Sequence, residues 1–261
     1  MLIGNERTYY HGLVGNSMQV RCLCPMVIYV SQSAPFEIST DGRSWETRHI
    51  IALAPFTKHR VKSSSNLISM ICIEPETVDP VDLMRLISLI NAPAAGKLFW
   101  QSIHVAHNEL AYQSDAHGFS TAEFDHSFLG EKLLRRTMDA RIVKVLEDLC
   151  TGSDGQLPSA DECAMETKLS TSRFLHLFKD STSVSFRSYR MWRRARRFLD
   201  RVNGQDSLTD VALDLGYPDS SHFSNSIRQI YGLQPRLIRD GSQHLRVHVG
   251  SGYQPSMPLF V

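Results

Sequence analysis

The sequence lacks the long apolar stretches that membrane insertion requires. No run of about 18 apolar residues occurs in its 261 positions, which argues against a transmembrane helix. The first residues lack a basic region followed by an apolar core, so no secretory signal is expected. Cysteine is scarce and odd in number, with Cys22, Cys24, Cys72, Cys150 and Cys163 in no recognised metal-binding spacing. We therefore expect a cytoplasmic protein with reduced thiols and no membrane contact.

Motifs that indicate catalysis are also missing. The chain has no glycine-rich phosphate loop, no serine nucleophile elbow and no HExxH sequence. The histidines His11, His49 and His59 are widely separated, and His104 and His107 stand at helical i, i+3 spacing. Metal sites need several convergent histidines or carboxylates, and ordinary surface histidines explain both sets more simply. We therefore expect no catalytic residue, no metal and no cofactor.

Net charge is only +1, but the charge is unevenly distributed. Residues 1–154 hold 14 Lys and Arg against 17 Asp and Glu, whereas residues 155–241 hold 13 against 10. This division fits an acidic regulatory part joined to a basic part that binds nucleic acid. The excess in the basic part is small, so it supports the interpretation without carrying it.

The first 75 residues predict short β-strands. Apolar residues alternate over residues 18–24, 36–38 and 51–55, and residues 67–73 resemble a strand that is buried on both faces. Asp41-Gly42 is a strong signal for a hairpin turn. Several short strands separated by turns indicate a small barrel or sandwich.

Residues 79–152 predict helices. Asp79-Pro80 is a helix start with proline in the first turn, and Ser120 with Glu123 forms a possible capping box. A last helix stops near Gly152, and its apolar stripe either packs on the barrel or forms a dimer interface. We assign that stripe to the dimer interface, and its residues are Ile142, Val145, Leu146 and Leu149.

One pattern occurs twice in the last third of the chain. Ala164 recurs as Ala212 and Leu169 recurs as Tyr217, both 48 positions later. The apolar positions of the helix that follows recur 49 positions later, at Phe174 and Phe223 among others. Each copy predicts a helix, a tight turn and a second helix. That plan is helix-turn-helix, in which the second helix can enter a DNA major groove.

Capping residues support the two units. Ser170 and Ser207 are good N-caps, because a serine hydroxyl accepts an otherwise unpaired backbone N–H. Asp219 is expected to cap the last helix of the second unit, and Gly216 can adopt the left-handed conformation that ends the helix before it.

A longer helix over residues 186–202 is predicted to join the units. Its apolar stripe is opposed by a face with seven arginines. For an isolated helix the simplest interpretation is a solvated basic face. Beside two helix-turn-helix units, phosphate binding is at least as good an explanation. The candidates for phosphate contact are Arg190, Arg194 and Arg197.

At this point the sequence resembles a known family. Segment 158–240 is similar to the DNA-binding domain of AraC/XylS-type transcription regulators. The matching residues are Ala212, Gly216-Tyr217, Ser221 and Phe223, Arg228, Gly232 with Pro235, and Arg239. The sequence departs from the family pattern at Ile227, where the family has an aromatic residue, and at Asn225, where the family usually has a basic one. A shorter stretch, residues 48–59, resembles the cupin-like segment of AraC-type sensor domains. The resemblance implies DNA binding by both second helices and a homodimer.

The resemblance also implies roles for individual residues. Base contacts are expected from Ser172, Leu175 and His176 in the first unit and from Ser220, Ser221, His222, Ser224 and Asn225 in the second. Phosphate contacts are expected from Ser170, Arg173, Lys179, Arg190, Arg194, Arg197 and Arg228. The second set of base contacts has no Arg or Lys that could bind guanine with two hydrogen bonds, so looser readout is expected there.

The sequence therefore predicts an α+β protein with a cupin-like β-barrel, helices, and an all-α domain of two helix-turn-helix units joined by a long helix. The expected boundaries are a sensor or dimerisation domain at 1–152, a linker at 153–158, a DNA-binding domain at 159–240 and a loosely ordered tail at 241–261. The expected function is that of a sequence-specific DNA-binding transcription regulator, an activator, controlled by a small-molecule signal or by dimerisation through the first domain. The expected partners are double-stranded DNA, a second copy of the chain in a homodimer, RNA polymerase if the protein activates, and a small-molecule effector. Two alternatives stay open, namely a cupin-type metal-dependent enzyme fused to a DNA-binding domain, and a ligand-independent regulator whose first domain only mediates assembly.

Overall fold

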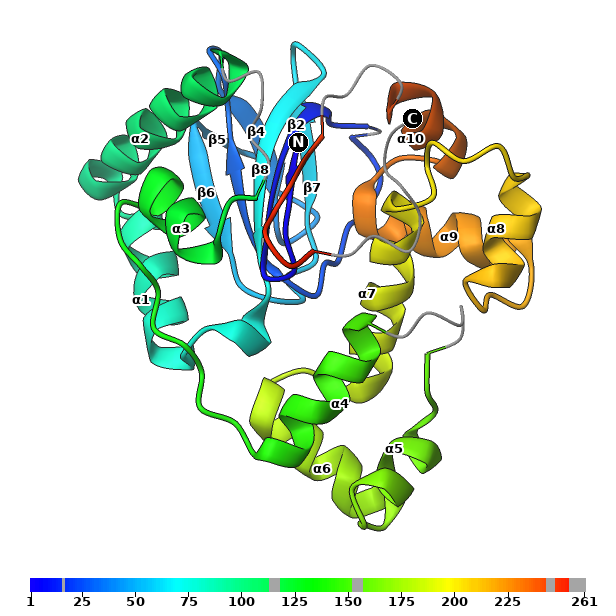
Figure 1. The fold of residues 1–261 in the computed structure, drawn as a ribbon. Coiled ribbons are helices and arrows are strands. Elements are labelled where there is room, and N and C mark those ends of the chain that lie inside the picture. Colours follow the sequence, from blue (N-terminus) through cyan, green and yellow to red (C-terminus); the bar gives the residue numbers. More distant parts are fainter. Residues whose placement is uncertain (16, 113–117, 152–156, 243–246, 254–261) are drawn as a thin grey trace. The chain divides into compact units, whose positions relative to one another are not determined.

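The protein divides into two compact units in a computed structural model, and each is described by itself (Figure 1). The described residues are 1–15, 17–112, 118–151, 157–242 and 247–253. The first unit, called the β-rich unit, comprises Met1–Arg135, Tyr231–Leu233 and the C-terminal segment Leu245–Tyr253. The second, called the helical unit, comprises Arg136–Ile230 and Gln234–His244.

Two β-sheets organise the β-rich unit. The larger has the strand order β6-β3-β8-β2-β1-β9, and the smaller has the order β5-β4-β7. The strands are β1 (Leu2–Ile3), β2 (Arg7–Leu13), β3 (Met26–Val30), β4 (Phe36–Ser39), β5 (Glu46–Arg48), β6 (Ile50–Leu53), β7 (Arg60–Ser63), β8 (Leu67–Ile73) and β9 (His248–Val249). Among the described residues both sheets have open edges, so the closed cupin-like barrel expected from the sequence is not confirmed.

Strand β8 lies inside the larger sheet because its sequence is apolar on both faces. It pairs antiparallel with β2, from Leu13↔Leu67 to Arg7↔Ile73, and antiparallel with β3 on its other side. Five of its seven residues are buried. The strands predicted over residues 36–38, 51–55 and 67–73 are thus observed as β4, β6 and β8, with β6 covering 50–53.

The Asp41-Gly42 turn is confirmed between β4 and β5. The Asp41 carboxylate accepts the backbone N–H groups of Arg43 and Ser44 at 2.8 and 2.9 Å. Gly42 has a φ of 75°, a left-handed conformation that glycine adopts without steric cost. These bonds satisfy the backbone of the loop, so the chain reverses and β4 pairs with β5.

Three helices contribute to the core of the β-rich unit. They are α1 (Pro80–Asn91), α2 (Pro93–Tyr112) and α3 (Thr121–Leu129), and a short 3-10 turn, η1 (Pro75–Thr77), precedes them. Met26, Ile28 and Val30 alternate along β3 and join a cluster that includes Leu86 of α1 and Phe128 of α3. Fully burying each such side chain stabilises the fold by about 1.5–3 kcal/mol. The predicted Asp79 cap and the capping box of Ser120 with Glu123 are both present.

Residues 18–24 do not form the strand that their alternation predicts. Met18 is 65% exposed, and the segment makes only an isolated bridge between Arg21 and His59. A strand needs hydrogen bonds to a neighbour over several residues. The alternation at Cys22 and Cys24 shows which side chains share a face. It does not show whether a neighbouring strand is available to pair with this segment.

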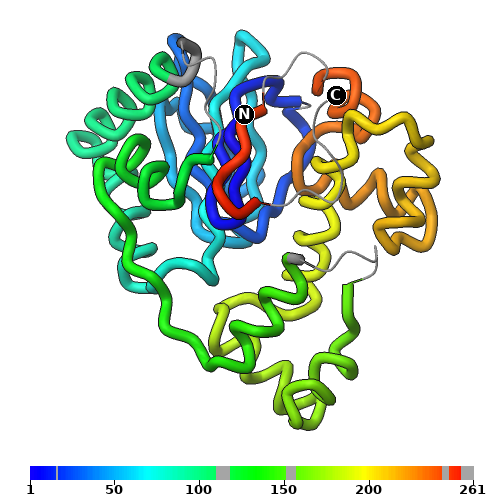
Figure 2. The backbone as a smooth tube through the Cα atoms, in the orientation of Figure 1, coloured from blue at the N-terminus to red at the C-terminus, as the bar shows by residue number. Residues whose placement is uncertain are grey.

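The C-terminal segment adds a strand to the larger sheet, which differs from the loose tail expected over residues 241–261. Strand β9 pairs parallel with β1, with Leu2 opposite His248 and Ile3 opposite Val249. Figure 2 shows this red segment beside the blue N-terminal strand. The pairing occurs because the edge of β1 offers unpaired backbone groups, which composition cannot reveal. Residues 254–261 lie outside the described ranges.

Seven helices are described in the helical unit. They are α4 (Ala140–Thr151), α5 (Ala160–Glu166), α6 (Thr171–Thr182), α7 (Phe186–Leu199), α8 (Leu208–Asp214), α9 (Ser220–Tyr231) and α10 (Pro235–Ser242). Within the described ranges, every helix of the chain is too short or too polar to span a bilayer.

Helix α4 packs inside the helical unit, against α6 and α7. Its apolar stripe is buried within one chain, because Ile142 and Leu149 are 0% exposed, Val145 is 1% exposed and Leu146 is 7% exposed. This burial conflicts with the dimer interface predicted for these four residues, because side chains covered within one chain are not available to a second copy. The stripe is amphipathic in either case, so its pattern could not identify which surface covers it. The predicted linker at 153–158 lies mostly outside the described residues.

Candidate nucleic-acid interface

The first helix-turn-helix unit consists of α5, a turn and α6. A capping box starts α5, with the Ser159 hydroxyl accepting from Glu162 N–H and the Glu162 carboxylate accepting from Ser159 N–H. Between the helices, Lys168 adopts a φ of 55°, and the Leu169 N–H donates to the Ala164 carbonyl at 2.9 Å. Ser170 then caps α6, as predicted. These bonds fix the direction in which α6 leaves the turn.

Helix α6 buries one face and exposes the other. Phe174 and Phe178 are 0% exposed and lie against Phe186 of α7, with ring centroids 5.1 Å apart in both cases. The residues predicted to contact DNA occupy the exposed face, namely Ser172, Arg173, Leu175, His176 and Lys179. Among the described residues, none of the four polar side chains in this set has a hydrogen-bonding or ionic partner. Their donors are therefore available to an external ligand.

The second unit repeats the same construction with α8, a turn and α9. Ser207 caps α8, as predicted. Gly216 has a φ of 74° at the position that corresponds to Lys168, 48 residues earlier. The Tyr217 N–H donates to the Ala212 carbonyl at 3.0 Å, which repeats the bond between Leu169 and Ala164. The sequence repeat is therefore a structural repeat down to individual hydrogen bonds.

Helix α9 differs from α6 in that its His222, Asn225 and Arg228 side chains have partners within the same segment. Asp219 accepts from the backbone N–H of His222 at 2.8 Å and contacts its ring nitrogen Nδ1 at 2.7 Å. Arg228 donates to the Asn225 side chain at 2.7 Å. The two hydrogen bonds between Asp219 and His222 lower the pKa of the Asp219 carboxyl, and the backbone bond has the larger effect.

The predicted contact residues of α9 are otherwise placed as expected. Ser220, Ser221, His222 and Asn225 are exposed, while Ser224 and Arg228 are half-buried. Phe223 and Ile227 face the core, at 1% and 0% exposure.

Helix α7 is shorter and more deeply buried than predicted. It ends at Leu199, three residues before the expected Val202, and its 14 residues span about 21 Å. Phe186 at its start contacts α6, and Phe198 near its end contacts Phe223 of α9 at a centroid distance of 5.1 Å. Helices α6 and α9 therefore attach near opposite ends of α7.

The arginines of α7 are not uniformly available to phosphate. Arg197 is 7% exposed, and burial together with Arg193 lowers the pKa of its guanidinium. The phosphate contact predicted for Arg197 conflicts with this burial, because a phosphate cannot reach an enclosed guanidinium. Arg190 is half-buried and donates to the Leu157 carbonyl at 2.7 Å. Arg194 is half-buried beside the Tyr217 ring. Helical periodicity identifies the arginine face of α7, but it does not show that Tyr217 of the second helix-turn-helix unit lies against that face.

The histidines considered as metal ligands have other partners in the β-rich unit. His59 lies between the Tyr29 hydroxyl and the Thr57 carbonyl, at 2.9 and 2.8 Å. His11 contacts the Ser69 hydroxyl at 3.0 Å, and the nearest described neighbour of its ring among the histidines is His107, 4.8 Å away between centroids. Burial lowers the pKa of His11 to about 4. Within the described ranges, no three His, Cys, Asp or Glu side chains converge as a metal site would require.

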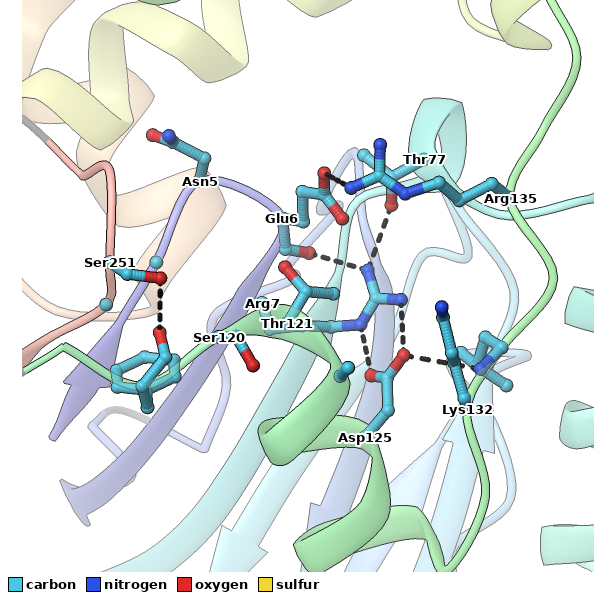
Figure 3. Close-up of a pocket in the computed structure, with 15 residues that line it drawn as sticks. Asn5, Glu6, Arg7, Thr77, Ser120, Thr121, Asp125, Lys132, Arg135 and Ser251 are labelled. Atoms are coloured by element: carbon cyan, nitrogen blue, oxygen red, sulfur yellow. Dashed lines mark hydrogen bonds and ion pairs between the residues drawn. The ribbon is translucent and has the colours of Figure 1, made fainter.

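The β-rich unit also contains a polar cavity of about 340 Å³ that the sequence did not predict (Figure 3). The buried pair of Arg7 and Asp125 lies in its wall, joined at 2.6 and 3.0 Å. The partners are 118 positions apart, and neither belongs to a motif. No signal in the sequence could have identified this cavity.

Comparison with known proteins identifies a helix-turn-helix domain in the region that contains the two repeated units. Residues 163–241 match the profile of the family described as "Helix-turn-helix domain", and this segment is a helix-turn-helix domain of the AraC type. The invasion protein InvF of Salmonella typhi is 40% identical over 49 residues, which is 19% of this chain and 23% of InvF. The same figures hold for InvF of Salmonella typhimurium. The chain thus spans less than a quarter of the curated relatives it matches.

Solved structures extend the likeness in fold beyond this segment. ToxT from Vibrio cholerae O395 aligns with a TM-score of 0.52 at 13% identity, over 90% of this chain and 96% of ToxT. ToxT bound to (E)-4-(8-methylnaphthalen-1-yl)but-3-enoic acid aligns with a TM-score of 0.50 at 12% identity, over 90% of this chain and 98% of ToxT. At such low identity the likeness shows a common two-domain α+β fold and no shared ligand.

Proposed function

We propose that this chain is a sequence-specific DNA-binding transcription regulator whose helices α6 and α9 enter the major groove. The observation that carries the proposal is the exposed face of α6, where Ser172, Arg173, His176 and Lys179 have no partner among the described residues. Donor groups left free on one helix face match the needs of DNA binding, in which phosphates fix position and base edges give specificity. The AraC-type helix-turn-helix domain at residues 163–241 supports the same function.

Within α6, the side chains divide by reach. Ser172, Leu175 and His176 are assigned to base edges, with Leu175 against a thymine methyl and His176 hydrogen-bonded to a purine. Arg173 and Lys179 are assigned to phosphates, together with the Ser170 cap. Basic side chains neutralise phosphates without reading sequence, so these contacts set affinity.

Helix α9 is assigned a weaker role in sequence readout. Its candidates for base contact, Ser220, Ser221, His222, Ser224 and Asn225, are short or already hydrogen-bonded. Arg228 is its candidate for phosphate contact. On α7, Arg190 and Arg194 remain candidates at the edge of the interface, and Arg197 is withdrawn because it is buried. We expect the second half of the DNA site to be recognised mainly through phosphates and DNA shape.

The β-rich unit is assigned control of DNA binding, by a small-molecule effector, by homodimerisation, or by both. A ToxT structure that contains a small organic acid supports the first mode for this fold. A homodimer bound to a long site would offset the weaker second helix by raising the local concentration of the first. Activation would follow if the DNA-bound protein contacts RNA polymerase. The dimer would be contradicted if the full-length protein sedimented as a monomer and its DNA footprint were no longer than that of the isolated helix-turn-helix domain.

The main test is selection from a random duplex DNA library with the full chain, followed by affinity measurement on the enriched sequence. The variant is Ser172→Glu, which places a carboxylate in the first turn of α6, where it suits the helix dipole but repels DNA. We expect a common motif to be enriched and the variant to lose at least about tenfold in affinity.

A matched control is Val81→Glu, which places the same residue at the second position of α1 in the β-rich unit, where Val81 is 78% exposed. This control should bind as the natural protein does. Failure to enrich any motif, or equal binding by Ser172→Glu and Val81→Glu, would overturn the proposed function.

A further inference from the structure

The cavity in the β-rich unit lies where five segments of the chain meet. It is lined by residues 4–7, Thr77, α3 and the residues just before it, Lys132, Leu133 and Arg135, and the C-terminal residues 250–251 (Figure 3). The hydrogen bonds that hold the C-terminal segment there include those from Gly250 N–H to the Ile3 carbonyl at 2.9 Å and from Ser251 N–H to the Phe119 carbonyl at 2.8 Å. Its volume of about 340 Å³ is in the range of pockets that hold small molecules.

The buried arginine in the wall of this cavity is held by four hydrogen bonds. Arg7 is 2% exposed and binds both oxygens of Asp125. Its remaining amino group donates to the Thr77 hydroxyl at 2.9 Å and to the Glu6 carbonyl at 3.0 Å, as Figure 3 shows. A second arginine, Arg135, pairs with the Glu6 carboxylate at 2.9 Å.

One cation of the cavity is left over. The ionisable residues that line it are three cations and two carboxylates, and each carboxylate already pairs with an arginine. Lys132 lines the cavity, is exposed, and has no anionic partner among the residues that the structure describes. The cavity therefore carries one uncompensated positive charge.

Two residues of the first turn of α3 that line the cavity have backbone donors left unused by the described residues. The capping box uses the N–H groups of Ser120 and Glu123. The N–H groups of Thr121 and Ala122, two residues that line the cavity, have no acceptor within the described part of the chain. Unused N–H groups in the first turn of a helix favour an anion.

We propose that this cavity binds a small polar molecule that carries a carboxylate or phosphate group, with the oxyanion between Lys132 and the first turn of α3. A polar lining of hydroxyl, amide and charged side chains favours a hydrophilic metabolite over an apolar one. Gly250 and Ser251 form part of the wall, so an occupant contacts the C-terminal strand directly. The proposal deepens, and for its regulatory meaning rests on, the proposed effector control of DNA binding.

The test uses full-length protein with inorganic phosphate and with succinate, each titrated at constant ionic strength with chloride as the balancing ion. Thermal unfolding and isothermal calorimetry report binding. We expect a saturable rise in Tm with at least one probe, and the probe that binds identifies phosphate or carboxylate as the preferred group. Binding to the folded state alone raises stability in proportion to the logarithm of ligand concentration.

Two variants remove the site without disturbing its support. Lys132→Glu reverses the free charge, and Thr121→Asp places a carboxylate in the first turn of α3, where it suits the helix dipole and preserves folding. Each should weaken binding by at least roughly tenfold. The control is Lys97→Glu, another exposed lysine of the β-rich unit with no ionic partner among the described residues, which does not line this cavity.

No saturable response to either probe, or equal responses from Lys132→Glu and Lys97→Glu, would overturn the inference. DNA affinity measured without added anion keeps the two proposals separate. If DNA binding fails while the anion binds at this cavity, the proposed function is wrong and the anion site stands. If DNA binds and neither probe does, the reverse holds.

Discussion

In the first helix-turn-helix unit the Leu169 N–H donates to the Ala164 carbonyl at 2.9 Å, and in the second the Tyr217 N–H donates to the Ala212 carbonyl at 3.0 Å. Inside, the units are alike, and each sets a buried phenylalanine of its second helix against α7. Outside, they differ. Helix α6 presents polar side chains that have no partner among the described residues. On α9, His222 is held by Asp219 and Asn225 is held by Arg228. The two units therefore share their internal construction and differ in the surface that they offer to an external ligand.

The largest expected effect tests the likeness of the interiors. Phe174→Ala and Phe223→Ala each remove a phenylalanine that is at most 1% exposed. Each should lower the free energy of unfolding by about 3–5 kcal/mol, because the lost burial adds to the cost of a cavity. Urea unfolding measures the loss, and Leu213→Ala, at 53% exposure, is the control. A much smaller loss in one of the two phenylalanine variants would show that the interiors are not equivalent.

The next effect tests the difference between the exteriors. His176→Ala should reduce discrimination at one base pair by about 1–3 kcal/mol, since His176 is free to contact a base edge. His222→Ala should change sequence preference less, because Asp219 already holds its ring. The measurement is binding to the selected site and to its single-base variants, with the exposed His126→Ala of the β-rich unit as control. Equal shifts in preference for the two variants would remove the distinction between α6 and α9.

A smaller effect concerns phosphate contacts and appears in the salt dependence. Arg173→Ala and Lys179→Ala should each lower the slope of log affinity against log salt by about 0.9, because one counterion release is lost. Arg228→Ala should lower it less, because its guanidinium is engaged by Asn225. The exposed arginine Arg141, paired with Asp139 at 2.8 Å, supplies the control. If Arg228→Ala gave as large a change as Arg173→Ala, pairing within α9 would not compete with phosphate.

The smallest effect is a difference in pH response between the two helix starts. Asp219 caps α9 with a carboxyl whose pKa is lowered, whereas Ser170 caps α6 with a hydroxyl that does not titrate. A lowered pKa contributes stability above the unfolded pKa and loses it as pH falls through the folded pKa. Below pH 4, the amide of His222 should therefore lose exchange protection before that of Arg173. Amide hydrogen exchange across this range measures the order, and simultaneous loss at both helices would count against a role for Asp219.

Much of the helical unit could be predicted from local sequence. The caps at Ser170, Ser207 and Asp219 and the buried positions of α6 and α9 depend on interactions within a few residues. The repeat located both turns, even though Lys168 takes the left-handed conformation where the second unit has Gly216. The exposed face of α6 followed from the same periodicity. These features were accessible because helices and turns satisfy their backbone groups locally.

The predictions that conflict with the structure concern features that depend on contacts between residues distant in the sequence. The apolar stripe of α4 at Ile142 and Leu149 is evident in the sequence. That α6 and α7 cover this stripe follows only from the tertiary packing. Arg197 lies on the face opposite the stripe of α7 and is only 7% exposed, which helical periodicity alone does not indicate.

The sequence by itself determined the repeat, because corresponding residues recur 48 positions apart. It also determined the helix starts at their caps and the polar face of α6, because these depend on residues three to four positions apart. Tertiary structure alone decided that the arginine face of α7 is largely enclosed and that β9 extends the sheet at β1. It alone also brought Arg7 to Asp125 in the wall of a cavity. Strand pairing and ion pairing join residues more than a hundred positions apart, and their energy depends on a geometry that no local pattern specifies.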